Sequence, residues 1–207
     1  MDNFINCYGS KNKKLLVENY DVNPILYLKL LPNQSKDGCC GRLTTNYYIF
    51  SAINKATNKE ILFYAGKHCA EEILKLIQKP KLELFNPLSV DLYQNMGGRN
   101  SSITTKIKLD STNNELIEAI KVISVAWSST PPPSILKIIE YTLSNPMVIN
   151  YKGIEWVNKS LTKDFKNRTL SEIVQDLKKE NPRLRDFTFE RLKRVISIKF
   201  PKEINKY

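Results

Sequence analysis

Short runs of apolar residues near the N-terminus predict β-strands. The runs at 14–17 and 25–31 are separated by turn-forming residues, which is typical of two successive strands. Two further runs, at 47–54 and 60–65, flank a polar pentapeptide and predict a β-hairpin. Both alternating faces of the run at 47–54 are largely apolar, so we expect this strand to be central in a sheet that also contains the earlier strands.

Apolar residues recur at helical spacing in the middle of the chain. A helix is expected over 70–78, directly after the hairpin, and residues 79–111 are expected to form an irregular connector because Pro, Gly and Asn interrupt any longer pattern. Residues 113–128 then predict a second helix. Thr112 or Asn113 is expected to be its N-cap.

The C-terminal third is predicted to be helical as well. Three consecutive prolines separate the preceding helix from another over 135–143. Residues 169–172, Thr-Leu-Ser-Glu, form a capping box and open a helix that ends at Asn181-Pro182. A last helix is expected over 187–198, with one apolar stripe and one basic side.

Together these elements predict an α+β fold. An N-terminal antiparallel β-hairpin or sheet with a helix is followed by a helical middle and by a helical, basic C-terminal unit. Charged residues become more frequent after residue 146. We therefore expect an α+β domain over 1–146, which contains the cysteine-bearing hairpin and two helices, and a separate helical unit over 147–207.

The length and composition are those of an ordinary globular protein. The chain has 207 residues, 42% of them hydrophobic, which is enough for a buried core. No run approaches the roughly 18 apolar residues that cross a membrane, and the first residues lack the segments of a signal peptide. We therefore expect a cytoplasmic protein with no membrane partner. Its four cysteines would be reduced thiols, metal ligands or buried packing residues rather than disulfides.

Basic residues outnumber acidic ones, and their excess is concentrated at the C-terminus. The chain has 32 Lys or Arg and 21 Asp or Glu, a formal net charge of +11. Residues 151–207 hold 15 basic and 8 acidic residues, a net charge of +7, and residues 1–150 hold 17 and 13, a net charge of +4. Because positive surfaces attract nucleic acid, the C-terminal end is the expected place for such a contact.

Two cysteine-bearing turns lie at the base of the predicted hairpin. Cys39-Cys40-Gly41 precedes the first strand, and Gly66-Lys67-His68-Cys69 leads from the second strand into a helix. Turns placed in this way can supply the tetrahedral thiolate or imidazole ligands of a structural zinc ion. Consecutive side chains point apart, so adjacent candidates are not expected to bind the same ion. The candidate ligands are Cys40, Cys69, Cys39, His68, Cys7 and Asp37.

The segment 37–78 resembles small hairpin zinc modules found in proteins of phages and mobile elements. The similarity rests on Cys40-Gly41, on the two strand-like runs, and on Gly66-Lys67-His68-Cys69 followed by the start of a helix. Those modules begin with a spaced cysteine pair, and Asp37 stands where the first cysteine of that pair would fall. The resemblance implies either a structural zinc ion or a degenerate module that has lost the metal.

Two other roles for the cysteines remain open. Cys39, Cys40 and Cys69 can pack as small apolar side chains, with His68 at the start of the helix. Alternatively, Cys69 at a helix N-terminus beside Lys67 and His68 can have the lowered pKa of a nucleophile. The chain has a single histidine and no known catalytic motif, so we do not expect an enzyme.

The two C-terminal helices are similar to the helix-turn-helix pair of winged-helix repressors such as ferric-uptake regulators. The similarity covers residues 169–196 and implies that the second, basic helix enters the DNA major groove. The connection is longer than in the simplest helix-turn-helix, too few residues follow residue 198 for a full wing, and the metal-sensing residues of those regulators have no counterparts. The expected nucleic-acid contacts, from this resemblance and from the basic side of the helix, are Arg183, Arg185, Thr188, Arg191, Lys193, Arg194 and Lys199.

Two functional hypotheses follow from these features. The first is a cytoplasmic nucleic-acid-binding accessory or regulatory protein of phage or mobile-element type, with DNA favoured over RNA by the helix pair. The second is a small interaction protein that binds and inhibits a host protein or nucleoprotein complex. The basic helix can also be an ordinary solvated surface, since Lys is abundant throughout the chain.

Overall fold

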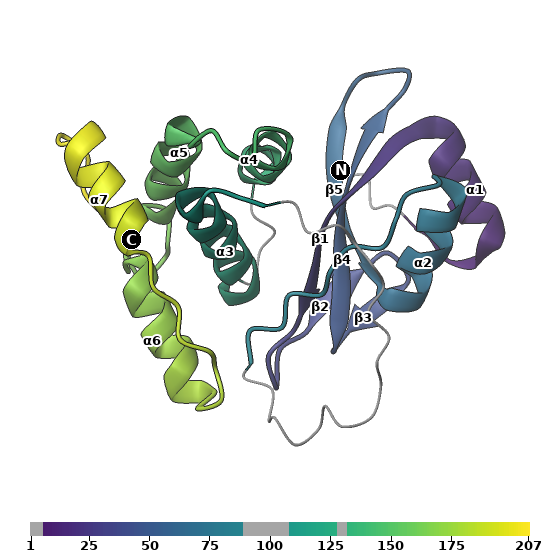
Figure 1. The fold of residues 1–207 in the computed structure, drawn as a ribbon. Coiled ribbons are helices and arrows are strands. Elements are labelled where there is room, and N and C mark those ends of the chain that lie inside the picture. Colours follow the sequence, from purple (N-terminus) through teal and green to yellow (C-terminus); the bar gives the residue numbers. More distant parts are fainter. Residues whose placement is uncertain (1–5, 89–107, 128–131) are drawn as a thin grey trace. The chain divides into compact units, whose positions relative to one another are not determined.

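The structure is a computed structural model, and it describes residues 6–88, 108–127 and 132–207 (Figure 1). The predicted α+β fold is confirmed, because an antiparallel sheet with helices is followed by further helices. Most of the connector expected over 79–111 lies outside the described residues.

Contacts within the chain group it into two compact units. Unit 1 contains residues 1–86 and 127–136, and unit 2 contains residues 87–126 and 137–207. The sequence instead places a domain boundary between residues 146 and 147. The difference arises because a helix from the middle of the chain packs against the C-terminal helices.

Unit 1 is built on a three-stranded antiparallel sheet. The strand order is β1-β4-β5, so the expected hairpin and the central position of its first strand are confirmed. A second, two-stranded hairpin joins β2 and β3. Along the chain the elements are α1 (Gly9–Asn19), β1 (Tyr20–Lys29), β2 (Lys36–Gly38), β3 (Gly41–Leu43), β4 (Asn46–Asn54), β5 (Glu60–Gly66) and α2 (Lys67–Leu76).

The core of unit 1 lies between one face of this sheet and the helices α1 and α2 (Figure 1). Aromatic rings run across the sheet: Tyr27 stacks on Tyr48 with ring centroids 4.1 Å apart, and Phe50 stacks on Phe63 at 5.2 Å. Leu16 of α1 and several residues of α2 pack into the same cluster. Three of the four cysteines, Cys7, Cys39 and Cys69, belong to this core as well, so their side chains lie in the packed interior of unit 1.

The strand predicted over 14–17 is wrong, because these residues lie in the helix α1. Lys13 and Leu16 are three residues apart and share the buried face of this helix. Leu16 enters the apolar core, and Lys13 Nζ lies 3.0 Å from Glu72 Oε2 on α2. A strand and a helix face cannot be told apart from a four-residue apolar run alone. In the structure this segment is helical and packs against α2. The next predicted strand, over 25–31, is confirmed in part by β1.

Unit 2 is helical within the described residues. The helix α3 packs against α5, α6 and α7, which explains why the contacts group it with the C-terminal end. No helix in the described ranges is long and apolar enough to cross a membrane. The elements are α3 (Ser111–Ala126), α4 (Pro133–Ser144), whose first residues belong to unit 1, α5 (Tyr151–Leu161), α6 (Leu170–Glu180) and α7 (Glu190–Lys199).

Side-chain caps define where two helices of unit 2 begin. Asp110 Oδ1 accepts hydrogen bonds from the backbone N–H groups of Thr112 at 2.8 Å and Asn113 at 3.3 Å. Asp110 therefore caps α3, and the predicted cap at Thr112 or Asn113 is wrong. The predicted capping box between Thr169 and Glu172 is confirmed at the start of α6.

Candidate metal centre

Cys39 and Cys40 form the two-residue loop of the β2–β3 hairpin. The residues that flank this loop, Gly38 and Gly41, pair across the hairpin. Gly41 has a φ of +128°, which residues with a side chain rarely adopt, and a Cβ on Gly38 would lie 2.7 Å from Leu43 Cδ1. The two glycines therefore permit the tight turn that carries both cysteines at its tip.

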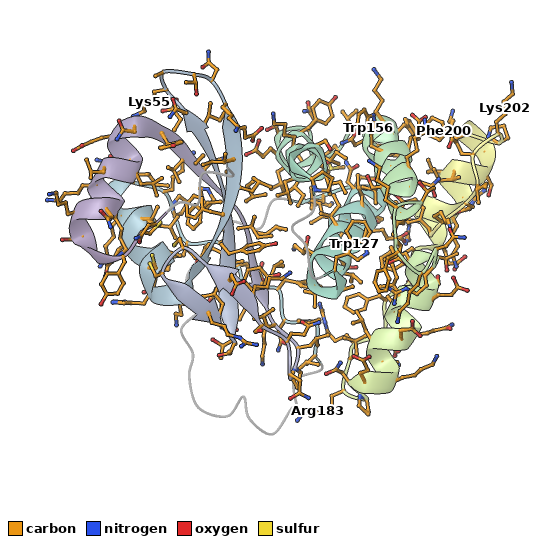
Figure 2. The ribbon with its side chains drawn as sticks, turned by 180° about the vertical axis from the view of Figure 1, so that it is seen from behind. Lys55, Trp127, Trp156, Arg183, Phe200 and Lys202 are labelled. Atoms are coloured by element: carbon orange, nitrogen blue, oxygen red, sulfur yellow. The ribbon has the colours of Figure 1, made fainter. Side chains whose placement is uncertain are left out.

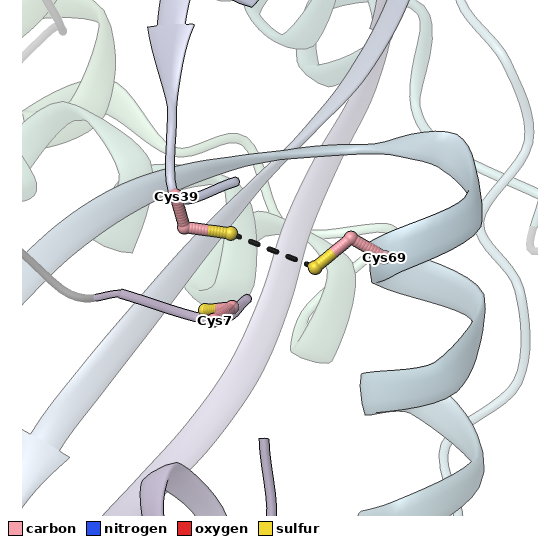
Figure 3. Close-up of side chains that lie close together, drawn as sticks. All are labelled: Cys7, Cys39 and Cys69. Atoms are coloured by element: carbon pink, nitrogen blue, oxygen red, sulfur yellow. Dashed lines mark hydrogen bonds between the residues drawn. The ribbon is translucent and has the colours of Figure 1, made fainter. Parts of the chain in front are cut away.

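Backbone hydrogen bonds bring other segments of unit 1 to this tip. Cys39 donates its N–H to the carbonyl of Tyr64 in β5 at 2.7 Å, and its own carbonyl accepts from the N–H of Cys7 at 3.2 Å. Cys69 lies in the first turn of α2, directly after β5. Three segments that are distant in sequence thus place their cysteines next to one another (Figure 3).

Two of the sulfur–sulfur separations match those expected around one metal ion, and a third is shorter. Cys39 Sγ is 3.6 Å from Cys69 Sγ (Figure 3) and 3.7 Å from Cys40 Sγ, and Cys40 Sγ is 3.1 Å from Cys69 Sγ. The sulfurs of Cys7, Cys39 and Cys69 are buried and all within 4.8 Å of one another, whereas Cys40 is exposed. With zinc–sulfur bonds of about 2.3 Å, the corners of a tetrahedron are about 3.8 Å apart. Small shifts of these side chains would therefore accommodate one ion.

Cys69 has the lowest pKa of the four thiols. The thiols of Cys39 and Cys7 lower its pKa to about 3, with further contributions from Cys40 and Lys13 and against the opposing effect of burial. Burial, followed by the hydrogen bond with Cys69, raises the pKa of Cys40 to about 11. Thiols that share one thiolate in this way become a set of metal ligands once a cation displaces their protons.

Two of the candidate ligands do not join the cluster. The His68 side chain is 92% exposed, and its Nε2 lies 3.2 Å from Glu72 Oε1. Asp37 is exposed and lies opposite Arg42 in the backbone register of β2 and β3. Consecutive cysteines were not expected to bind the same ion, and the two-residue loop holds the sulfurs of Cys39 and Cys40 3.7 Å apart, with Cys40 Sγ 3.1 Å from Cys69 Sγ. This geometry permits binding of both to one ion but does not test it. The residues that the structure brings together are Cys7, Cys39, Cys40 and Cys69.

Lys13 is a residue of this centre that sequence reasoning missed. Its side chain is only 8% exposed and is paired with Glu72. Burial acts against its charge, but the hydrogen bond with Glu72 and the nearby Cys69 raise the pKa of Lys13 overall. A lysine in a polar helix is usually solvated, so no local pattern marks it, and only the contact between α1 and α2 reveals its position.

The residues predicted to contact nucleic acid lie on α7 and on the connection before it. Arg191 Nη1 lies 2.7 Å from Glu115 Oε1 on α3, and Lys193 Nζ lies 2.9 Å from Glu190 Oε1, so both cations are held in ion pairs. The connection over 181–189 carries Arg183 (Figure 2), Arg185 and Thr188, and the helix carries Arg191, Lys193, Arg194 and Lys199.

The outer side of α7 remains basic. Leu192 and Ile196 are the buried residues of the helix and pack into unit 2. Arg194 and Lys199 are exposed, and Lys199 Nζ lies 5.4 Å above the ring of Tyr151. Residues 200–207 add no strand to the helices, so the described chain has a basic helix at this end but no wing beside it.

Comparison with known proteins identifies a family. No curated protein and no solved structure matches the chain. A family profile with the description "Uncharacterised conserved protein UCP028583" matches residues 5–204, nearly the whole chain and all four cysteines. The protein therefore belongs to this family, UCP028583.

Proposed function

We propose that the four cysteines bind one structural zinc ion in unit 1 and that the protein is a nucleic-acid-binding accessory or regulatory protein. The convergence of four sulfur atoms from three chain segments supports the zinc site. The exposed cations on the outer side of α7, together with the net charge of +11, support the contact with nucleic acid.

A set of four thiolates favours zinc over the other common metal ions. Sulfur ligands select zinc, copper(I) or iron–sulfur clusters, whereas magnesium and calcium prefer oxygen. The separations of Cys39 Sγ from Cys69 Sγ and from Cys40 Sγ, 3.6 and 3.7 Å, fit a single tetrahedral ion. Four protein ligands leave no position for a substrate or a water molecule, so the ion would tie Cys7, the β2–β3 hairpin and α2 together rather than catalyse a reaction.

The surroundings of the cluster compensate the charge of such a site. Zinc bound by four thiolates carries a net charge of −2. Lys13, Arg42 and Lys67 line the same surface hollow as Cys40 and Cys69. Glu72, which pairs with Lys13, lines the hollow as well, so three cations and one carboxylate surround the cysteines, and the remaining positive charge favours the deprotonated thiols that zinc requires.

The metal content of the purified protein tests the zinc proposal directly. We expect one equivalent of zinc per chain when the protein is purified under reducing conditions without added metal. Native mass spectrometry would show the mass of the chain plus one zinc, and a thiol reagent would react with four cysteines only after addition of a strong chelator. A metal-free chain with four freely reactive cysteines would contradict the proposal.

Phosphate contact by the outer side of α7 predicts a specific salt dependence. Each neutralised phosphate contributes about 0.7 to 0.9 to the slope of log K against log salt. Replacing both Arg194 and Lys199 by Ala should therefore lower this slope by roughly 1.4 to 1.8. The measurement is fluorescence anisotropy with labelled single-stranded DNA, duplex DNA and RNA between low and moderate salt.

A charge-matched control separates this contact from general attraction. Lys59 and Lys75 are exposed residues of unit 1, and replacing both by Ala removes the same charge. This control should leave the slope almost unchanged. An equal loss in the two double variants would mean that α7 is not the contact, and no binding of any of the three nucleic acids at low salt would overturn the nucleic-acid part of the proposal.

An apolar surface on unit 2 favours the interaction protein as a second candidate function. Tyr141 is 55% exposed, and Met147 and Val148 in the turn between α4 and α5 are 64% and 60% exposed. Apolar side chains that are grouped on a surface often mark a contact with a protein partner. The aliphatic side chains in this turn cannot stack on bases, so they fit a protein better than a nucleic acid.

Substitution in this turn tests the second candidate. Changing Met147 and Val148 together to Lys should abolish the capture of a partner from nuclease-treated host lysate, because the apolar contact is lost while the fold is kept. The double change of Arg194 and Lys199 to Ala serves as the control and should retain the partner. Equal capture by both double variants would rule out this surface as the interface.

A further inference from the structure

Phe165 is exposed to an unusual extent in the connection between α5 and α6. Its side chain is 83% exposed, the highest value among the large apolar residues of the described chain. A single exposed apolar residue is common, but an almost fully exposed Phe in a well-ordered turn is informative. The structure of the turn explains why the ring does not fold back onto unit 2.

A buried carboxylate fixes this turn from within. The Asp164 side chain is 0% exposed, and its Oδ2 accepts hydrogen bonds from the backbone N–H of Lys166 and the backbone N–H of Arg168, each at 3.1 Å. Arg168 Nη2 donates to Asp164 Oδ1 at 2.9 Å, and Arg168 Nη1 reaches Asp176 Oδ2 on α6 at 3.0 Å. The turn is therefore tied to itself and to the next helix.

The C-terminal segment holds the other end of the turn. Lys206 is 7% exposed, and its Nζ donates to the backbone carbonyl of Asn167 at 2.8 Å and to Asn167 Oδ1 at 2.7 Å. The backbone N–H of Leu170 donates to the carbonyl of Lys206 at 2.6 Å. With both ends held, residue 165 is confined to the outside of the turn, so little ordering entropy is lost when its ring contacts a partner.

Cations surround the exposed ring. Lys166 Nζ lies 5.5 Å and Arg168 Cζ lies 5.6 Å from the ring centroid of Phe165. Lys163, on the other side of Phe165 in sequence, is exposed. Arg168 is paired with the buried Asp164 and with Asp176, so the exposed cations beside the ring are Lys163 and Lys166.

We propose that Phe165 is a stacking platform for an unpaired base of single-stranded nucleic acid, with Lys163 and Lys166 contacting the adjacent phosphates. This inference rests on the proposed nucleic-acid binding and specifies the strand type. In a duplex the base faces are covered by their neighbours, so a protruding ring can stack only on a base that is unpaired. An aromatic ring between cations is the arrangement with which proteins bind single strands without sequence preference.

Binding of a labelled single strand by the full-length chain tests the inference. The probes are fluorescein-labelled oligomers of 20 thymidines or 20 uridines and a 20-base-pair duplex. Phe165→Ala should weaken binding of both single strands by at least about fivefold, the lower end of the effect known for base stacking. Phe165→Tyr should bind like the original protein, Phe165→Leu should bind like Phe165→Ala, and binding of the duplex should be the same in all variants.

A matched control and the pattern of losses separate the possible failures. Trp156→Ala removes another exposed aromatic side chain of unit 2 and should leave single-strand binding unchanged. If the original protein binds the single strands and Phe165→Ala or Phe165→Leu binds them equally well, the stacking inference is overturned while nucleic-acid binding stands. If the original protein binds none of the probes, the proposed function itself fails, and Phe165 is then better explained as a contact for a protein partner.

Discussion

Replacing Cys69 by Ser is expected to abolish zinc binding and to unfold unit 1. Cys69 Sγ lies 3.1 Å from Cys40 Sγ and 3.6 Å from Cys39 Sγ, and its pKa is lowered by the neighbouring thiols of Cys39 and Cys7. A serine hydroxyl does not ionise near neutral pH and is a poor ligand for zinc. Structural zinc sites contribute on the order of 10 kcal/mol of apparent binding free energy, which is comparable with the whole stability of a domain. Metal analysis and thermal unfolding followed by circular dichroism would measure both effects.

The other ligands provide a graded series and a control. Cys40 is exposed, so in Cys40→Ser a water molecule can take the place of the lost thiolate at the proposed metal ion. Cys40→Ser should therefore weaken zinc binding less than Cys39→Ser or Cys69→Ser. His68 is adjacent to Cys69 but 92% exposed, so His68→Ala should keep one zinc per chain and an unchanged thermal midpoint. Loss of zinc in His68→Ala, or its retention in Cys69→Ser, would show that the ligand set is different.

The cysteine centre shows how far local patterns in the sequence lead. The hairpin β4–β5 and the helix directly after it are encoded by adjacent residues, and both are confirmed. Cys39 and Cys40 were not expected to bind the same ion because consecutive side chains point apart, but the two-residue loop between Gly38 and Gly41 holds their sulfurs 3.7 Å apart. The position of Cys7 depends on a backbone hydrogen bond to Cys39, which no local pattern predicts.

The basic helix at the C-terminus also depends on contacts between distant residues that local patterns do not predict. The apolar stripe of α7 was predicted, and Leu192 and Ile196 are indeed buried. Arg191 was assigned to solvent or nucleic acid, yet its side chain pairs with Glu115, and Glu115 Oε2 also accepts from the backbone N–H of Arg191 at 3.0 Å and of Leu192 at 3.4 Å. Glu115 thus caps a helix that begins 75 residues later in the chain, a relation that only the packing of α3 on α7 creates.

Asn113 carries out a similar role for the turn between α4 and α5. Its side chain is fully buried, and Nδ2 donates to the carbonyls of Pro146 at 3.1 Å and Val148 at 2.8 Å. Its Oδ1 accepts from the backbone N–H of Asn150 at 3.0 Å. One side chain therefore satisfies three backbone groups in a turn that has no regular secondary structure, and it holds Met147 and Val148 in their exposed positions.

Replacing Asn113 by Ala is expected to destabilise unit 2 by about 3 to 5 kcal/mol, because several buried backbone groups would lose their partner at a cost of about 1 to 3 kcal/mol each. Asn114 is the adjacent, exposed residue of the same helix, so Asn114→Ala is the matched control and should change stability by less than about 0.5 kcal/mol. Asn113→Asp keeps an acceptor for Asn150 but loses both donors, so it should be nearly as unstable as Asn113→Ala. Urea unfolding of the three variants gives the comparison, and equal midpoints for Asn113→Ala and Asn114→Ala would mean that the turn does not depend on this side chain.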